Sequence, residues 1–264
     1  MIDHNNLEAF ADPINYDQED SSDTGVAFYC ALAQEAGGAA LELACGTGRV
    51  SIPIAKLGFP VTGLDIVPGM IARAQSKSAG LPTRWVVGDA RTFDLGERFR
   101  LIFLTGNAFQ AFLTRADQEA LLDGVRAHLD DEGLFAFETR NPRWEGLETR
   151  AEAYEGVFFN LETSPEEHGW QTYIDANGQR VRTSYTQLYD HVAQILHLTG
   201  YKRWREGQEE HTQITRIALR YTFPQELAAL LQSQGFTIIR QYGDWNLEPL
   251  TAASPSIIVV CRLS

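Results

Sequence analysis

The chain is poor in cysteine and has no long apolar run, and each absence excludes a class of protein. Its 264 residues include only three cysteines, Cys30, Cys45 and Cys261. Three widely spaced cysteines do not form a disulfide framework or a zinc cluster, and they favour a reducing compartment. Because no stretch of 18 apolar residues occurs, we expect no membrane span.

Basic residues are also scarce. The chain has 22 Lys and Arg against 35 Asp and Glu, which gives a formal net charge of −13. Binding to a phosphate backbone needs a basic face, so we expect no nucleic-acid partner. Residues 1–6 show neither the basic region nor the apolar run of a secretory signal, so we expect a cytoplasmic protein. No His-x-x-x-His or similar pair occurs, so we expect no metal.

The acidic excess is concentrated at the N-terminus. Residues 1–24 contain seven acids and no Lys or Arg. One interpretation is a solvated, mobile leader. The other is a flap over the active site, in which Tyr16 and Asp17 touch cofactor or substrate, because mobile segments commonly serve as lids.

A glycine-rich turn follows the first apolar segment. Residues 39–43 are typical of a buried parallel strand, and residues 50–57 of the helix behind it. Gly46 and Gly48 lie between them, where glycine lets a ligand approach the backbone and the first helical N–H groups attract an anionic or polar group. Glu42 lies inside the strand, where a charge is costly unless paired, so we expect an ammonium group, or water held by it, as its partner.

Two further acids follow the next two strands. Asp65 closes the strand at 60–64 and follows Gly46 by 19 residues, a spacing typical of an acid that accepts both ribose hydroxyls. Asp89 follows the strand at 83–87 and could accept a hydrogen bond from an adenine amino group. Alone, each acid would more often be a helix cap or a solvated strand end. Three acids in order at successive strands favour a pocket for a nucleoside with a charged tail.

These motifs resemble those of the class I S-adenosylmethionine-dependent methyltransferases. Residues 42–49 match that family's first motif, Asp65 matches its ribose acid, and Asp89 with Ala90 matches its adenine motif. The resemblance covers residues 25–140 and resumes at 224–263. It implies an α/β fold, with a Rossmann-like seven-stranded methyltransferase sheet whose last strand is antiparallel, and S-adenosyl-L-methionine as cofactor.

The expected binding residues follow from this resemblance. Ile66 and Met70 would cover the faces of the adenine. The fourth strand, at 101–104, ends at Thr105-Gly106-Asn107, where many members carry an acid that this chain lacks. We expect cofactor contacts from Glu42, Ala44, Gly46, Thr47, Gly48, Asp65, Ile66, Met70, Asp89, Ala90, Thr105 and Gly106. We expect substrate contacts from Tyr16, Asn107 and Trp245, the last of which follows the sixth strand.

Residues 141–221 interrupt the expected core domain, which comprises residues 25–140 and 222–264. Residues 171–185 predict a β-hairpin around Asn177-Gly178, and 195–198 and 213–219 predict further strands. We therefore expect an appended antiparallel β-sheet. It would form the roof of the substrate pocket, a homodimer surface, or both, because edge strands invite pairing with a second subunit.

The sequence does not identify a catalytic residue. His191 and His197 are predicted on strands, six residues apart and therefore facing the same way. Either histidine, or Tyr16, is a candidate general base. For each histidine, however, a structural role is the commoner outcome, because spacing places no partner acid beside it.

We therefore expect an enzyme that transfers a methyl group to a nitrogen or oxygen of a small molecule. The reaction would be an in-line displacement at the sulfonium methyl, which needs alignment more than side-chain chemistry. One alternative is a non-catalytic module that binds S-adenosylmethionine but has no enclosed second pocket. The other is an NAD-dependent oxidoreductase, which would carry G-x-G-x-x-G or G-x-G-x-x-A where this chain has Ser51.

Overall fold

A computed structural model describes residues 6–19, 22–143, 164–175 and 178–264. The helices are α1 (Pro13–Glu19), α2 (Val26–Ala36), α3 (Ser51–Lys56), α4 (Pro68–Lys77), α5 (Arg115–His128) and α6 (Pro224–Ser233). The strands are β1 (Ala40–Leu43), β2 (Val61–Asp65), β3 (Thr83–Val87), β4 (Phe99–Leu104), β5 (Leu129–Arg140), β6 (Ser164–Ile174), β7 (Arg180–Asp190), β8 (Ile195–Glu206), β9 (Glu209–Arg220), β10 (Phe236–Tyr242) and β11 (Ser256–Leu263).

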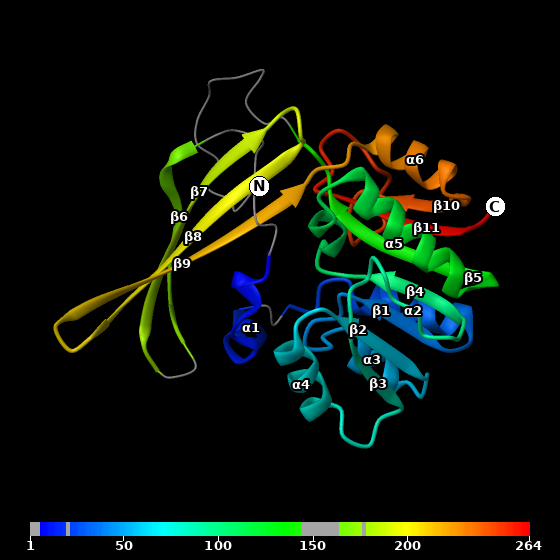
Figure 1. Cartoon of the computed structure of the whole chain (residues 1–264), viewed down its shortest axis with the longest axis horizontal. Coiled ribbons are helices and arrows are strands. Elements are labelled where there is room, and N and C mark those ends of the chain that lie inside the picture. Colours follow the sequence, from blue (N-terminus) through cyan, green and yellow to red (C-terminus); the bar gives the residue numbers. More distant parts are fainter. Residues whose placement is uncertain (1–5, 20–21, 144–163, 176–177) are drawn as a thin grey trace.

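The strands form two sheets that lie side by side (Figure 1). One has seven strands in the order β10-β11-β5-β4-β1-β2-β3, and the other has four in the order β6-β7-β8-β9. Strands β1 to β5 pair in parallel, whereas β11 is antiparallel to both of its neighbours. The predicted Rossmann-like sheet with an antiparallel last strand and an appended antiparallel sheet is therefore confirmed.

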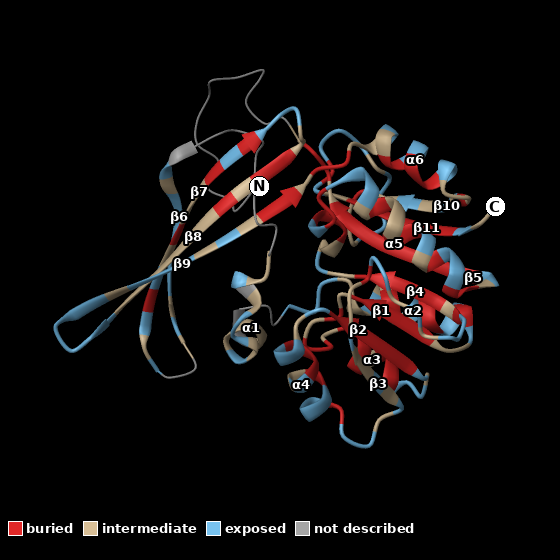
Figure 2. Ribbon diagram, in the orientation of Figure 1, coloured by how far each residue is buried: buried red, intermediate tan, exposed pale blue. Residues whose placement is uncertain are grey.

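Helices cover both faces of the seven-stranded sheet. Helices α5 and α6 enclose one apolar cluster against it, and α2 and α3 enclose another. All four side chains of β1 are buried, as expected for a central parallel strand (Figure 2). Because parallel strands share a direction, the carboxyl ends of β1 to β5 meet at one edge, which faces α1 and the four-stranded sheet (Figure 1).

Helix α5 shows how local sequence sets an element's boundary. The Thr114 hydroxyl accepts a hydrogen bond from the Asp117 N–H at 3.0 Å, and the Asp117 carboxylate accepts one from the Thr114 N–H at 3.2 Å. This reciprocal capping box satisfies donors at the helix start. The helix accordingly begins at Arg115, directly after Thr114.

The four-stranded sheet is a meander of long antiparallel strands. Strands β6 and β7 form the predicted hairpin, although Asn177 of its turn lies outside the described residues. His197 lies on β8 as predicted, but the prediction that His191 also lies on a strand is wrong. Strand β7 ends at Asp190, and His191 lies in the turn that leads to β8.

Arg220 anchors this sheet to the core. Its guanidinium donates to the Leu113 carbonyl at 3.3 Å and to the Glu226 carboxylate at 2.9 Å. The N-terminal segment covers the edge of β9, where Asn6 and Glu8 accept hydrogen bonds from the backbone N–H groups of Ala218 and Arg216. Edge strands are commonly protected in this way from unwanted pairing.

Candidate functional site

The glycine turn after β1 has left-handed backbone conformations. Ala44, Gly46 and Gly48 have φ of 54°, 53° and 82°. A Cβ on Gly48 would lie 2.7 Å from the Trp85 ring, so packing as well as conformation requires this glycine. A Cβ on Gly46 would contact, among the described residues, only the Tyr16 ring, at 3.8 Å. Positive φ at the non-glycine Ala44 stores strain of about 1 kcal/mol, and such strain gathers at functional sites.

Glu42 is buried and is held by groups of the chain itself. One carboxylate oxygen accepts hydrogen bonds from the Ser51 N–H at 3.0 Å and the Ser51 hydroxyl at 2.5 Å. The other accepts from the Thr105 hydroxyl at 2.8 Å. Burial raises the pKa of Glu42 to about 7, although the bonds from Ser51 and Thr105 oppose that shift. Glu42 thereby joins the start of α3 to the turn that follows β4.

Asp65 lies at the end of β2 and supports the glycine turn. Its Oδ2 accepts a hydrogen bond from the Gly46 N–H, and its Oδ1 accepts one from the Val67 N–H, both at 2.8 Å. A carboxylate offers about four lone-pair positions, so one remains on each oxygen for a ligand hydroxyl. Next to it, Ile66 is 43% exposed, whereas the Met70 side chain is buried.

Asp89 lies at the end of β3 and is paired with Arg91. Its Oδ1 accepts from the Arg91 N–H at 2.9 Å, and its Oδ2 accepts from Arg91 Nη2 at 2.6 Å. Arg91 also donates to Asp117 at 3.0 Å. The hydrogen bonds from Arg91 hold the pKa of Asp89 below its usual value. An adenine amino group would therefore have to share this carboxylate with Arg91, beside the buried Ala90.

The turn after β4 is held by a residue that the sequence analysis did not identify. Gly106 and Asn107 have φ of 64° and 58°, and the Ala108 N–H donates to the Thr105 carbonyl at 3.1 Å. The Asn107 N–H donates to Oε1 of Glu138, a buried residue of β5, at 3.2 Å. Asn107 Oδ1 is buried and has no hydrogen-bond donor among the described residues. The one sequence signal for Glu138 was an acid directly after the apolar residues 134–137.

Helix α1 lies between the two sheets and is tied to the glycine turn (Figure 1). The Asp17 carboxylate accepts a hydrogen bond from the hydroxyl of Thr47 and pairs with Arg73 and Lys77 of α4, each at 2.7 Å. Burial would raise the pKa of Asp17, but hydrogen bonds from Lys77, Thr47 and Arg73 hold it below its usual value.

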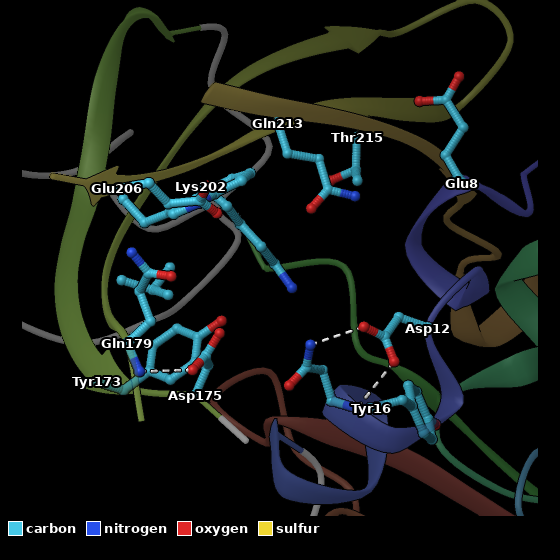
Figure 3. Close-up of a pocket in the computed structure, with 13 residues that line it drawn as sticks. Glu8, Asp12, Tyr16, Tyr173, Asp175, Gln179, Lys202, Glu206, Gln213 and Thr215 are labelled. Atoms are coloured by element: carbon cyan, nitrogen blue, oxygen red, sulfur yellow. Dashed lines mark hydrogen bonds between the residues drawn. The ribbon is translucent and has the colours of Figure 1, made fainter. Parts of the chain in front are cut away.

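A cavity of about 250 Å³ lies between the N-terminal segment and the four-stranded sheet (Figure 3). Its lining is polar and aromatic. The carboxylates are Glu8, Asp12, Asp175 and Glu206, the cation is Lys202, and the rings are Tyr16, Tyr173 and Trp204. Tyr16 therefore lines this cavity and also lies beside Gly46.

The other expected residues lie apart from this cavity. Trp245 packs against Phe28 and Tyr29, with ring centroids 5.8 and 6.0 Å apart. Neither His191 nor His197 lines the cavity. Within the described ranges, no group of three or more His, Cys, Asp or Glu side chains is placed to hold a metal ion. No helix of those ranges is long and apolar enough to cross a membrane.

Comparison with known proteins finds similarity to methyltransferases. Residues 40–133 match a family model described as a methyltransferase domain. A putative methyltransferase of Bacillus subtilis, YqeM, is 25% identical over 212 residues, which cover 79% of this chain and 77% of that protein. A ubiquinone biosynthesis O-methyltransferase of Methylobacterium sp. is 30% identical over 176 residues, which cover 64% of this chain and 67% of that protein.

Solved structures share the fold over nearly the whole chain. An S-adenosylmethionine-dependent methyltransferase from Clostridium acetobutylicum has a TM-score of 0.75 at 17% identity, over 94% of this chain and 96% of that one. CalS10, an amino pentose methyltransferase from Micromonospora echinaspora, has a TM-score of 0.67 at 20% identity, over 94% of both chains.

Proposed function

Because the chain belongs to the class I S-adenosylmethionine-dependent methyltransferases, we propose that it methylates a nitrogen or oxygen of a small-molecule acceptor. The observation that carries the acceptor class is the cavity between the N-terminal segment and the four-stranded sheet, which are the elements that the carboxyl ends of the parallel strands face (Figure 1). Ligands of open α/β sheets bind outside these strand ends. A non-catalytic binding module would need no second cavity.

The residues at the strand ends fit the cofactor. Asp65 keeps one lone pair on each oxygen for the two ribose hydroxyls, and Gly46 leaves its backbone open toward the methionyl tail. Glu42 orients Thr105 and the start of α3 around that tail. When bound, S-adenosylmethionine would supply an activated methyl group, to which the acceptor's lone pair bonds in line as the carbon–sulfur bond breaks and S-adenosylhomocysteine leaves. The chain's own contribution is therefore alignment of the two reactants and exclusion of water.

The charge of the cavity favours an amine over other acceptors. Four carboxylates and three aromatic rings line it against one lysine, and both kinds of group attract an ammonium ion, which becomes the nucleophilic amine when it loses a proton. The buried, unpartnered Asn107 Oδ1 is a further acceptor for an N–H donor at the strand edge. Similarity in fold to CalS10, an amino pentose methyltransferase, supports the same class.

The test is transfer of isotope from methyl-labelled S-adenosylmethionine to a mixed metabolite extract. We expect label in one or a few small amines, and transfer by the Asp65→Ala variant that is about 10- to 150-fold slower when S-adenosylmethionine is below saturation. Label only in phenols or alcohols would exclude the amine preference. No transfer to any component under several conditions would contradict the proposed function.

We further propose that residues 1–24 act as a flap, with α1 closing over the bound cofactor. Asp17→Asn removes the charge that pairs with Arg73 and Lys77. We expect amide hydrogen exchange in α1 to rise about fivefold, and S-adenosylhomocysteine to dissociate faster, because charge-assisted bonds of this kind contribute about 1 kcal/mol.

Asp23→Asn is the matched control for the flap. It makes the same charge change at an exposed position of the same segment. If Asp17→Asn shows the same hydrogen exchange in α1 and the same dissociation rate of S-adenosylhomocysteine as this control, α1 does not cover the cofactor.

We also propose that the four-stranded sheet, besides roofing the acceptor cavity, serves as a homodimer surface. Strand β6 forms one edge of this sheet, and the other edge, β9, is covered by Asn6 and Glu8. Pairing of β6 with a second copy would extend the sheet. Sedimentation equilibrium tests this, and a monomer at all concentrations would exclude it.

A further inference from the structure

Two buried ionisable groups beside the turn after β4 have no part in the mechanism above. Tyr29 of α2 is 0% exposed, and Glu138 of β5 is 4% exposed. The Tyr29 hydroxyl oxygen lies 2.5 Å from Glu138 Oε2 and 2.9 Å from the Leu104 carbonyl oxygen. The second oxygen of Glu138 accepts the Asn107 N–H at 3.2 Å. A continuous chain of contacts thus runs from the Asn107 backbone to the last carbonyl of β4.

The number of protons shared by Glu138 and Tyr29 determines which hydrogen bonds form along these contacts. A tyrosine hydroxyl carries one proton, so it donates either to Glu138 or to Leu104. If Glu138 were ionised, either its Oε2 or the Leu104 carbonyl oxygen would receive no proton and would face a lone pair of the Tyr29 oxygen. Such a contact is unfavourable in a buried site. If Glu138 carries a proton, it donates to Tyr29, and Tyr29 donates to the Leu104 carbonyl. Each contact then has its own hydrogen.

The surroundings favour the protonated form. Burial raises the pKa of Glu138 above its usual value, although hydrogen bonds from Tyr29 and from the Asn107 backbone oppose that shift. Burial raises the pKa of Tyr29 well above its usual value. Loss of a proton from either group would place a charge among side chains that are almost inaccessible to solvent.

We infer that Glu138 is a neutral positioning residue of the methyl-transfer site, donating its proton to Tyr29 while its other oxygen fixes the backbone of Asn107. This inference rests on the proposed function, in which Thr105 helps to hold the cofactor and Asn107 offers an acceptor to the substrate. Glu42 holds Thr105 from the opposite neighbour strand, β1, at 2.8 Å. The turn is thus fixed by one buried acid on each side. Glu138 brings a carboxyl group to the turn where many members of the family carry an acid, but it acts through the backbone rather than by touching substrate.

Two substitutions test whether Glu138 holds the turn in its neutral form. In Glu138→Gln, the amide carbonyl accepts from Asn107 and the NH₂ group donates to Tyr29, so the amide reproduces the protonated acid. In Glu138→Ala, both contacts are lost. We expect hydrogen exchange of the Asn107 amide to be unchanged in the glutamine variant and about five- to tenfold faster in the alanine variant.

The protonation state is measured directly by infrared spectroscopy. We expect the carbonyl band of a protonated carboxylic acid at pH 7, lost on Glu138→Gln. Glu42 has a pKa of about 7 and would contribute a similar band, so both spectra are recorded in a Glu42→Gln background. Absence of the band would overturn the inference, whether or not methyl transfer is observed, because the spectrum needs neither cofactor nor acceptor.

Transfer of labelled methyl supplies the functional readout. We expect Glu138→Gln to keep the wild-type pH profile and a rate within about twofold, and Glu138→Ala to lose about tenfold through misplacement of the turn. A folded but inactive Glu138→Gln would show that the ionised carboxylate is needed, and would overturn the inference. A wild-type protein that shows the band but transfers no methyl group would contradict the proposed function instead.

Discussion

Asp65→Ala is expected to weaken binding of S-adenosylhomocysteine by about 1.5–3 kcal/mol, or roughly 10- to 150-fold, the range for hydrogen bonds to a charged group. The carboxylate is 7% exposed, and two backbone N–H groups fix it so that one lone pair remains on each oxygen. These are the positions that two vicinal ribose hydroxyls would fill. Isothermal titration calorimetry measures the change.

The control separates ligand contact from support of the glycine turn, since Asp65 also accepts the Gly46 N–H. Asp131→Ala removes an acid that is 94% exposed at the amino end of β5, and should leave affinity unchanged. Thermal unfolding of each variant reports stability separately. An Asp65→Ala protein that is less stable but binds S-adenosylhomocysteine as tightly as the wild type would make Asp65 a structural cap only.

The wild-type protein is expected to lose folding stability as the pH rises from 5 to 8, and Glu42→Gln is expected to remove much of that loss. The folded-state pKa of Glu42 is about 7, and the usual value is 4.5. An acid whose pKa is raised by folding stabilises the folded state fully below its unfolded pKa. That stability is lost as the pH rises through the folded pKa. The loss amounts to about 3 kcal/mol once the pH exceeds 7.

A glutamine can satisfy the same partners as Glu42. Its carbonyl oxygen accepts from both Ser51 groups, and its NH₂ donates to the Thr105 hydroxyl. Urea unfolding of wild type and variant at several pH values measures the difference. Some pH dependence should remain in the variant, because burial also raises the pKa of Glu138. If the free energy of unfolding changed equally with pH in the two proteins across this range, the raised pKa of Glu42 would be contradicted.

Local patterns were sufficient to predict most of the core. Largely apolar segments such as 39–43 and 101–104 predict strands buried on both faces. The order of Glu42, Asp65 and Asp89 at successive strands gave the candidate cofactor site, because parallel strands bring their carboxyl ends to one edge.

Contacts between distant residues were not predictable in this way. Glu138 reaches the turn at Asn107 across the neighbouring strand, and Asp17 pairs with Arg73 of another helix. Their sequence neighbours do not indicate these partners. The error at His191 has a local cause. The tight turn there includes Gln194 at φ 59°, a left-handed conformation that glycine or asparagine usually signals.

The measurement that tests the central claim most directly is calorimetric titration of the purified protein with S-adenosylmethionine, S-adenosylhomocysteine and NAD in parallel. We predict binding of the two sulfur nucleosides with dissociation constants of about micromolar, roughly −8 kcal/mol, and no heat from NAD. Binding of NAD alone, with none of either sulfur nucleoside, would contradict the account.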